Sequence, residues 1–227
     1  MRDYYEARAA EYDDWYLGVG LHAARDRPGW HRQLAGLCSA VAALPPADTL
    51  DVACGTGYLT RLLRGRVTGL DVSPAMLAIA ASRAPDGVFV QADATALPFA
   101  DGRFRRVFAG HFYGHLEPDV RDRFLAEAAR VARELVVVDS ALRRDGDMAG
   151  MPLGLFAPPS DRSQAERMQP RQLRDGSRHA VYKRYFTPDR LAAELGGETL
   201  LAGDWFVMVR APLPPPGGHS SRATASR

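Results

Sequence analysis

One short segment, Thr49–Thr60, constrains the fold of this chain more than any other. It reads TLDVACGTGYLT, an apolar run closed by Asp51, then a turn with Gly55 and Gly57, then a helical pattern that begins at Tyr58. Glycine lets a backbone turn sharply and pass close to a ligand. The segment therefore predicts a buried strand, a tight turn and a helix, a junction at which α/β proteins bind nucleotides.

The rest of the chain repeats this alternation of short apolar runs and helical stretches, which is typical of βα units around a parallel sheet. Further strands are expected at Arg66–Leu70, Gly87–Gln91, Phe104–Gly110 and Leu135–Asp139, with a closing hairpin of Glu198–Leu201 and Trp205–Arg210. Helices are expected over Gly29–Leu44 and Asp119–Arg133, and after the Ser73-Pro74 and Thr187-Pro188 starts. The predicted fold class is α/β, a doubly wound, mostly parallel sheet with a C-terminal antiparallel hairpin and helices on both faces.

We expect one domain over residues 1–211, because 227 residues of 46% hydrophobic content suffice for one substantial core. Residues 1–46 are expected to form an N-terminal helical lid. Residues 143–185 break the βα pattern with Pro, Gly and Arg but keep several apolar side chains, so we expect an ordered insertion near the active site. Residues 212–227 have the composition of a disordered tail.

Composition limits the partners and the compartment. The formal net charge of +2 does not favour nucleic acid or an anionic membrane as a partner. The two cysteines are too few for a disulfide framework or a zinc ribbon, and the motifs suggest no metal site. No apolar run approaches the ~18 residues typical of a membrane span. We expect a cytoplasmic protein with a small-molecule substrate, and the oligomeric state stays open.

Three acidic residues close three successive predicted strands: Asp51, Asp71 and Asp93. The carboxyl ends of parallel strands face one crevice, so these side chains should converge there. Asp71 follows Asp51 by twenty residues, about the spacing at which a βαβ nucleotide fold presents a carboxylate to ribose hydroxyls. A dinucleotide site would need a third glycine at position 60, where this chain has Thr60, so a nicotinamide-dependent dehydrogenase is disfavoured.

Three motifs in order carry a family resemblance: DVACGTG at 51–57, GLDVSPAML at 69–77 and QADATALPFADGRF at 91–104. Together they resemble the motif set of the Rossmann-like (class I) S-adenosylmethionine-dependent methyltransferases, most closely the small-molecule type that includes the quinone-biosynthesis enzymes. The resemblance implies S-adenosyl-L-methionine as cofactor, S-adenosyl-L-homocysteine as product, and O-, N- or C-methylation of a small molecule by in-line displacement. Secondary metabolism is one setting for such a reaction.

The resemblance also implies roles for individual residues in binding the cofactor. Asp71 would hold the ribose, Val72 and Met76 would pack on the adenine, and Asp93 would accept from the adenine amino group. Ala53 replaces the first glycine of the commonest motif, a change that costs little if its φ angle is negative. The implied cofactor set is Asp51, Ala53, Gly55, Gly57, Asp71, Val72, Met76, Asp93, Ala94, Ala109 and Gly110.

Two alternatives stay open at this point. The fold could bind the cofactor and catalyse a different reaction, such as a cyclisation, or it could be a non-catalytic partner that only binds the cofactor.

On the acceptor side, two histidines that follow the fourth predicted strand, His111 and His115, are the candidate catalytic residues, as base or as acceptor-orienting group. The candidate substrate-binding residues are Tyr5, Tyr12, Tyr16 and Tyr113, and Tyr113 is expected to form a wall of the pocket. The N-terminal tyrosines could instead pack on the core.

Basic residues outnumber acidic ones between positions 143 and 184. This excess favours a substrate with a carboxylate or phosphate, or forms a solvated face.

Overall fold

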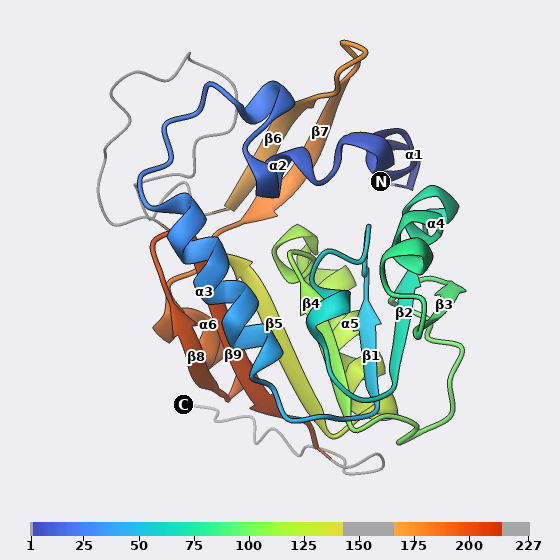
Figure 1. Ribbon diagram of the computed structural model, residues 1–227. Coiled ribbons are helices and arrows are strands. Elements are labelled where there is room, and N and C mark those ends of the chain that lie inside the picture. Colours follow the sequence, from blue (N-terminus) through green and yellow to red (C-terminus); the bar gives the residue numbers. More distant parts are fainter. Residues whose placement is uncertain (1, 143–165, 215–227) are drawn as a thin grey trace.

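The computed structural model describes residues 2–142 and 166–214. A seven-stranded sheet in the order β3-β2-β1-β4-β5-β9-β8 forms its centre, and β9 runs in the direction opposite to the other six strands (Figure 1). The strands are β1 Thr49–Val52, β2 Val67–Asp71, β3 Val88–Gln91, β4 Arg106–Gly110, β5 Glu134–Ser140, β8 Glu198–Ala202 and β9 Phe206–Pro212. The predicted Rossmann-like fold class, with its C-terminal antiparallel hairpin, is confirmed.

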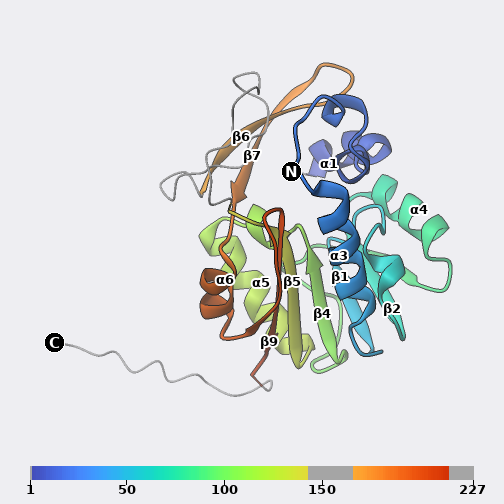
Figure 2. The same ribbon diagram turned by 60° about the vertical axis from the view of Figure 1, so that its left-hand side comes forward.

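Helices cover both faces of this sheet. Helices α3 (Trp30–Ala42) and α4 (Pro74–Arg83) lie on one face, and α5 (Pro118–Val131) and α6 (Pro188–Leu195) lie on the other (Figure 2). The predicted helix starts at Ser73-Pro74 and Thr187-Pro188 are confirmed, because each hydroxyl accepts a hydrogen bond from a backbone N–H in the first turn.

Each helical layer packs its own hydrophobic cluster against the sheet. Phe124 of α5 and Leu191 of α6 are fully buried on one face, and Leu37 of α3 is fully buried on the other. The apolar residues of β4 and β5 alternate between the two clusters, as a central strand covered on both faces requires.

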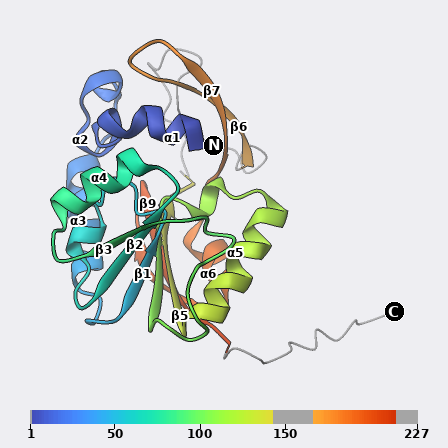
Figure 3. The same ribbon diagram turned by 90° about the vertical axis from the view of Figure 1, so that its right-hand side faces the viewer.

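A second layer lies beyond the carboxyl ends of the parallel strands (Figures 1 and 3). Its N-terminal part, called the lid below, contains α1 (Arg2–Arg8), η1 (Ala9–Glu11), α2 (Asp14–Leu17) and η2 (Gly20–His22). Its other part is an antiparallel hairpin of β6 (Glu166–Gln172) and β7 (Arg178–Arg184). Both strands fall within residues 143–185, for which an insertion but no strands were predicted from the sequence.

One predicted helix is a much shorter element. The pattern that begins at Tyr58 forms only a 3-10 turn, η3 (Thr60–Leu62), because Leu63 is already extended and Gly65 has a φ of +99°. A Cβ at Gly65 would lie 2.4 Å from the Ala47 carbonyl oxygen, so the chain there must turn closely past the loop before β1. Residues 143–165 of the expected insertion and 215–227 of the expected tail lie outside the described residues.

Gly57 tests how tightly the glycine turn packs on α4. Its φ is +74°, and an added Cβ would lie 3.0 Å from the Ala80 Cα. We expect Gly57→Ala to lower the free energy of unfolding by about 2–3 kcal/mol, from backbone strain plus crowding. Gly102→Ala is the matched control, because Gly102 has a φ of +63° with open space around it, and it should lose only about 1 kcal/mol. Equal losses in urea unfolding of the two variants would contradict this packing.

Candidate active site

The glycine turn after β1 is fixed by the carboxylate of Asp71 at the end of β2. The Gly55 N–H donates to Asp71 Oδ2 at 2.9 Å, and the Ser73 N–H donates to Oδ1 at 2.9 Å. Burial raises the pKa of Asp71, and these backbone donors oppose that rise. The two strand ends are therefore held together at the position predicted for ribose recognition.

A cavity of about 510 Å³ opens above this turn, between the sheet, the lid and the hairpin. Its lining includes eight residues of the predicted cofactor set: Ala53, Gly55, Asp71, Val72, Met76, Asp93, Ala94 and Gly110. One space is therefore lined by carboxylates at two strand ends, by exposed backbone at the turn and by the apolar surface of Val72 and Met76. This combination suits an adenosine, with its hydroxyls and flat purine ring.

Three other members of the predicted cofactor set lie outside this lining. Asp51 is 2% exposed, and its Oδ2 accepts from the Thr60 hydroxyl at 2.6 Å. Burial raises the pKa of Asp51 to about 7. Gly57 packs against α4, and Ala109 is fully buried in the core. In the described structure these residues shape the floor of the site from beneath.

The backbone is strained at two points of the cavity wall. Ala53 has a φ of +54° and His111 a φ of +56°, and no other described non-glycine residue has a positive φ. The φ of Ala53 is therefore positive and not negative, so alanine in place of glycine does carry a cost here. A left-handed alanine is destabilised by about 1 kcal/mol or more. Both residues follow strand ends, and strain of this kind is typical of functional sites.

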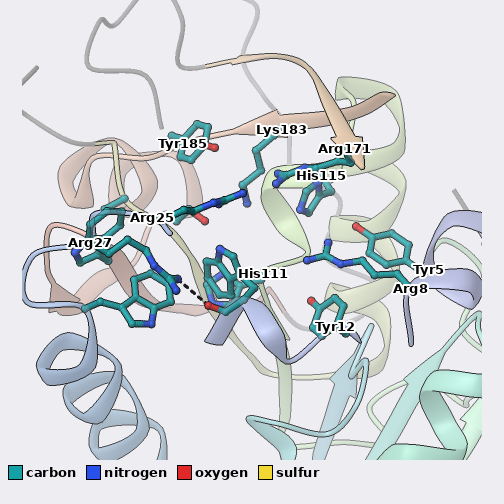
Figure 4. Close-up of a pocket in the computed structure, with 15 residues that line it drawn as sticks. Tyr5, Arg8, Tyr12, Arg25, Arg27, His111, His115, Arg171, Lys183 and Tyr185 are labelled. Atoms are coloured by element: carbon teal, nitrogen blue, oxygen red, sulfur yellow. Dashed lines mark hydrogen bonds between the residues drawn. The ribbon is translucent and has the colours of Figure 1, made fainter. Parts of the chain in front are cut away.

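A second, smaller cavity of about 80 Å³ adjoins the first and shares four wall residues with it: Tyr5, Tyr12, His111 and His115. Side chains from the lid, the loop before α3, the hairpin and β5 meet around it (Figure 4). Five of its described lining residues are cations, namely Arg8, Arg25, Arg27, Arg171 and Lys183, and none is acidic.

In the sequence, Arg171 and Lys183 stand out only as part of the basic excess between positions 143 and 184, and Arg8, Arg25 and Arg27 were not predicted as site residues. A local signal existed for Arg8, which is four residues from both Tyr4 and Tyr12 and so shares a helical face with them. The Arg8 guanidinium donates to the Tyr4 hydroxyl at 2.7 Å and lies 4.9 Å from the Tyr12 ring centroid.

The two candidate histidines lie at the junction of the cavities. His111 is 8% exposed, and neither of its ring nitrogens has a hydrogen-bond partner among the described residues. Burial lowers the pKa of His111 to about 4, so the ring is neutral at pH 7. His115 Nδ1 lies 2.7 Å from the Tyr182 carbonyl oxygen, which assigns the proton to Nδ1 and leaves Nε2 as an acceptor.

The four candidate tyrosines divide into two groups. Tyr5 and Tyr12 line both cavities. Tyr16 is 3% exposed, its ring stacks on that of Tyr58 with centroids 4.0 Å apart, and it lines neither cavity. Tyr113 corrects the sequence analysis, which expected a pocket wall. It is fully buried in the core, where its hydroxyl donates to Glu194 at 2.6 Å.

Comparisons with known proteins agree with this geometry. The family model described as "Methyltransferase domain" matches residues 49–134. The demethylmenaquinone methyltransferase of Thermotoga maritima is 36% identical over 46% of this chain and 45% of its own length. An N,N-dimethyltransferase of dTDP-3-amino-3,6-dideoxy-alpha-D-glucopyranose from Streptomyces fradiae is 38% identical over 60% of this chain and 53% of its own length. The chain thus spans about half the length of these two curated relatives.

Among solved structures, the DhpI–SAH complex superposes with a TM-score of 0.63 and 25% identity, over 94% of this chain and 95% of that one. The DhpI–SAM–HEP complex gives a TM-score of 0.64, with 25% identity, over 92% and 94% of the two chains.

These matches support the Rossmann-like, class I S-adenosylmethionine-dependent methyltransferase family that the motifs resemble: residues 49–134 match a methyltransferase domain, and the chain is similar in fold to a protein solved with SAH and with SAM. The residues of the larger cavity fit the cofactor of that family, with acceptors for hydroxyls and amine, and backbone exposed at the turn. The described residues contain no helix that is long and apolar enough to cross a membrane.

The buried, neutral state of His111 predicts a pH effect on stability. Its folded pKa of about 4 lies below the ordinary value of 6.5, so the unfolded chain binds more protons between these values. Wild-type stability relative to His111→Gln should therefore rise by up to about 3 kcal/mol between pH 4 and pH 6.5. Urea unfolding at both pH values measures this, and His31→Gln, an exposed position on α3, is the control. A difference that does not change with pH would contradict it.

Proposed function

We propose that this chain binds S-adenosylmethionine in the larger cavity and transfers its methyl group to a small-molecule acceptor. The single observation that carries the proposal is the convergence of the glycine turn, Asp71 and Asp93 on one cavity that adjoins a second, polar one. The curated relatives act on different acceptors, a quinone precursor and an amino sugar by their names, so they support the reaction class without fixing the acceptor.

In this proposal each cofactor group meets a fitting protein group. Asp71 accepts from the ribose hydroxyls, Val72 and Met76 pack against the adenine, and Asp93 accepts from its amino group. Gly55, Ala94 and Gly110 supply backbone where atoms crowd, while Asp51, Gly57 and Ala109 support the turn from beneath.

The bound cofactor supplies an activated methyl group on a sulfonium. The protein's contribution is alignment and the exclusion of water. Tyr5 and Tyr12 of the lid separate the two cavities from solvent and orient the acceptor. His111 is neutral and has no hydrogen-bond partner among the described residues, and it accepts a proton from the acceptor or donates a hydrogen bond to it. His115 Nε2 is the second candidate acceptor of a proton.

The proposal extends to partners and location. We propose a cytoplasmic enzyme without a nucleic-acid partner, which is supported by the small net charge and by the free state of both cysteines, Cys38 and Cys54.

Cofactor binding is tested first, by calorimetric titration with S-adenosylmethionine and S-adenosylhomocysteine. Asp71→Asn should weaken binding by about 10- to 100-fold, because a charged acceptor for the ribose is lost. Asp86→Asn, at an exposed position in the loop before β3, should leave affinity unchanged. Melting curves of both variants exclude a folding defect. Wild-type protein that binds neither ligand would refute the proposal.

Transfer is tested with methyl-labelled S-adenosylmethionine and a panel of phenols, amines and organic acids. Labelled product together with stoichiometric S-adenosylhomocysteine is the expected result. His111→Ala should keep cofactor affinity within about threefold of wild type and lower turnover at least tenfold. His115→Ala should also lower turnover. Product formed without consumption of the cofactor, or binding without any product, would contradict methyl transfer.

A further inference from the structure

The smaller cavity is built almost entirely from cations and aromatic rings, and this composition defines a class of acceptor. Arg8 comes from the lid, Arg25 and Arg27 from the loop before α3, Arg171 from β6 and Lys183 from β7 (Figure 4). Segments far apart in the sequence thus bring five positive charges to a space of about 80 Å³. Like charges so close together repel one another, and a bound anion would remove that cost.

Two of these cations have defined surroundings that leave their charge uncompensated by a carboxylate. Arg8 contacts the Tyr4 hydroxyl and the Tyr12 ring, and Arg27 donates to the Trp15 carbonyl oxygen at 2.7 Å and lies 3.9 Å from the Trp30 ring centroid. Within the described residues neither guanidinium forms an ion pair. Their hydrogen-bond partners are neutral, so the positive charge of both side chains stays directed at the cavity.

Among the described residues, the buried carboxylate nearest to these cations already has a cationic partner. Asp139 of β5 is fully buried, and its Oδ1 lies 2.5 Å from Lys183 Nζ, while its Oδ2 accepts from the Gly114 N–H at 2.7 Å. This pair balances one positive charge and fixes the lysine beside the cavity. Among the described residues, this pair therefore leaves the charges of Arg8 and Arg27 without a carboxylate partner.

Burial and the closeness of the positive charges shift the pKa values of groups around this cavity. Burial, together with the positive charges of Arg171 and Arg27, lowers the pKa of Arg25 to about 9. Burial and the Lys183 charge lower the pKa of His111 and His115 and keep both rings neutral. Burial also lowers the pKa of Arg171, whereas at Arg8 burial is outweighed by the neighbouring tyrosines, which raise the pKa.

The position of the cavity connects it to the reaction. It shares Tyr5, Tyr12, His111 and His115 with the larger cavity, so a group held by the arginines lies next to the cofactor space. His111 lies at this junction, at least nine-tenths buried, and within the described parts of the chain neither of its ring nitrogens has a hydrogen-bond partner. Its neutral ring N–H is free to donate to an oxygen there.

We propose that the methyl acceptor is a small organic oxyanion, whose carboxylate or phosphoryl group is bound in the smaller cavity by Arg8, Arg25, Arg27, Arg171 and Lys183. The planar guanidinium groups suit both oxyanions, because their donors match paired oxygens. The cavity has roughly the volume of three water molecules, which fits one such group and leaves the rest of the acceptor beside the cofactor space. A cationic acceptor is excluded by repulsion.

This inference rests on the proposed function, and its test separates the two. The full-length chain is saturated with S-adenosylhomocysteine and titrated calorimetrically with three probes of similar size: ethylphosphonate, propionate and ethylamine. At least one oxyanion should bind, more weakly as sodium chloride is added, and ethylamine should not. Binding of ethylphosphonate alone identifies a phosphoryl acceptor, and preferential binding of propionate identifies a carboxylate.

Substitutions then assign the binding to this cavity. Arg8→Gln and Arg171→Gln should each lower oxyanion affinity at least tenfold while keeping S-adenosylhomocysteine affinity within about threefold. Arg171→Lys, which retains the charge, should recover part of the loss. Arg105→Gln is the control, an exposed arginine just before β4 at the opposite end of the sheet.

Failure of S-adenosylhomocysteine to bind would refute the proposed function. If it binds but neither oxyanion does, or if oxyanion binding is unaffected by Arg8→Gln and Arg171→Gln, the inference is overturned and the proposed function stands.

Discussion

Two backbone amides from different parts of the chain donate to the two oxygens of Asp71, and most of the site depends on this carboxylate. Gly55 belongs to the turn after β1, and Ser73 begins α4. The Ser73 hydroxyl accepts from the Met76 N–H and donates to Glu6 of the lid at 2.5 Å. One buried acid thus fixes the glycine turn, the start of a helix and the position of the lid above them, so the floor and the roof of the larger cavity share one anchor.

The smaller cavity is rich in buried positive charge, whereas the larger one is organised around the buried carboxylate of Asp71. Burying a cation is costly unless it is paired or hydrogen-bonded. Lys183 meets this requirement through Asp139, whose pKa is lowered overall because the positive charges near it outweigh the effect of burial. Arg8 and Arg27 meet it, among the described residues, through neutral partners. The fold therefore retains positive charge at this place, where a structure selected for stability alone would contain apolar residues.

The features that the sequence could predict are those determined by local pattern and spacing. The glycine turn, the Asp71 position and the helix starts at Ser73 and Thr187 follow from short stretches whose geometry is set by their own residues. The prediction for Tyr113 was wrong because a residue two positions after His111 could face either the pocket or the core. Its inward direction depends on Glu194, 81 residues further along the chain, which no local pattern records.

The cationic cavity could not be predicted for the same reason. Its arginines come from the lid, a loop and a hairpin, which are distant in the sequence and meet only when the second layer folds over the sheet. The β6–β7 hairpin was missed because its strands, with the sequences ERMQPRQ and RHAVYKR, carry charged residues and a proline in place of a clear apolar alternation. Tertiary pairing decides the conformation of such strands.

The lid couples the two cavities physically. Asp13 accepts from the Thr56 hydroxyl at 2.6 Å and pairs with Arg83 at 2.5 Å, which ties the lid to the glycine turn and to α4. On the other side, Arg174 of the hairpin pairs with Asp14 and Glu11. Tyr5 and Tyr12 line both cavities, and Arg8 lines the smaller one from the same lid segment. A shift of the lid therefore changes the walls of both cavities together, and any effect of one ligand on the affinity for the other must be reciprocal by thermodynamic linkage.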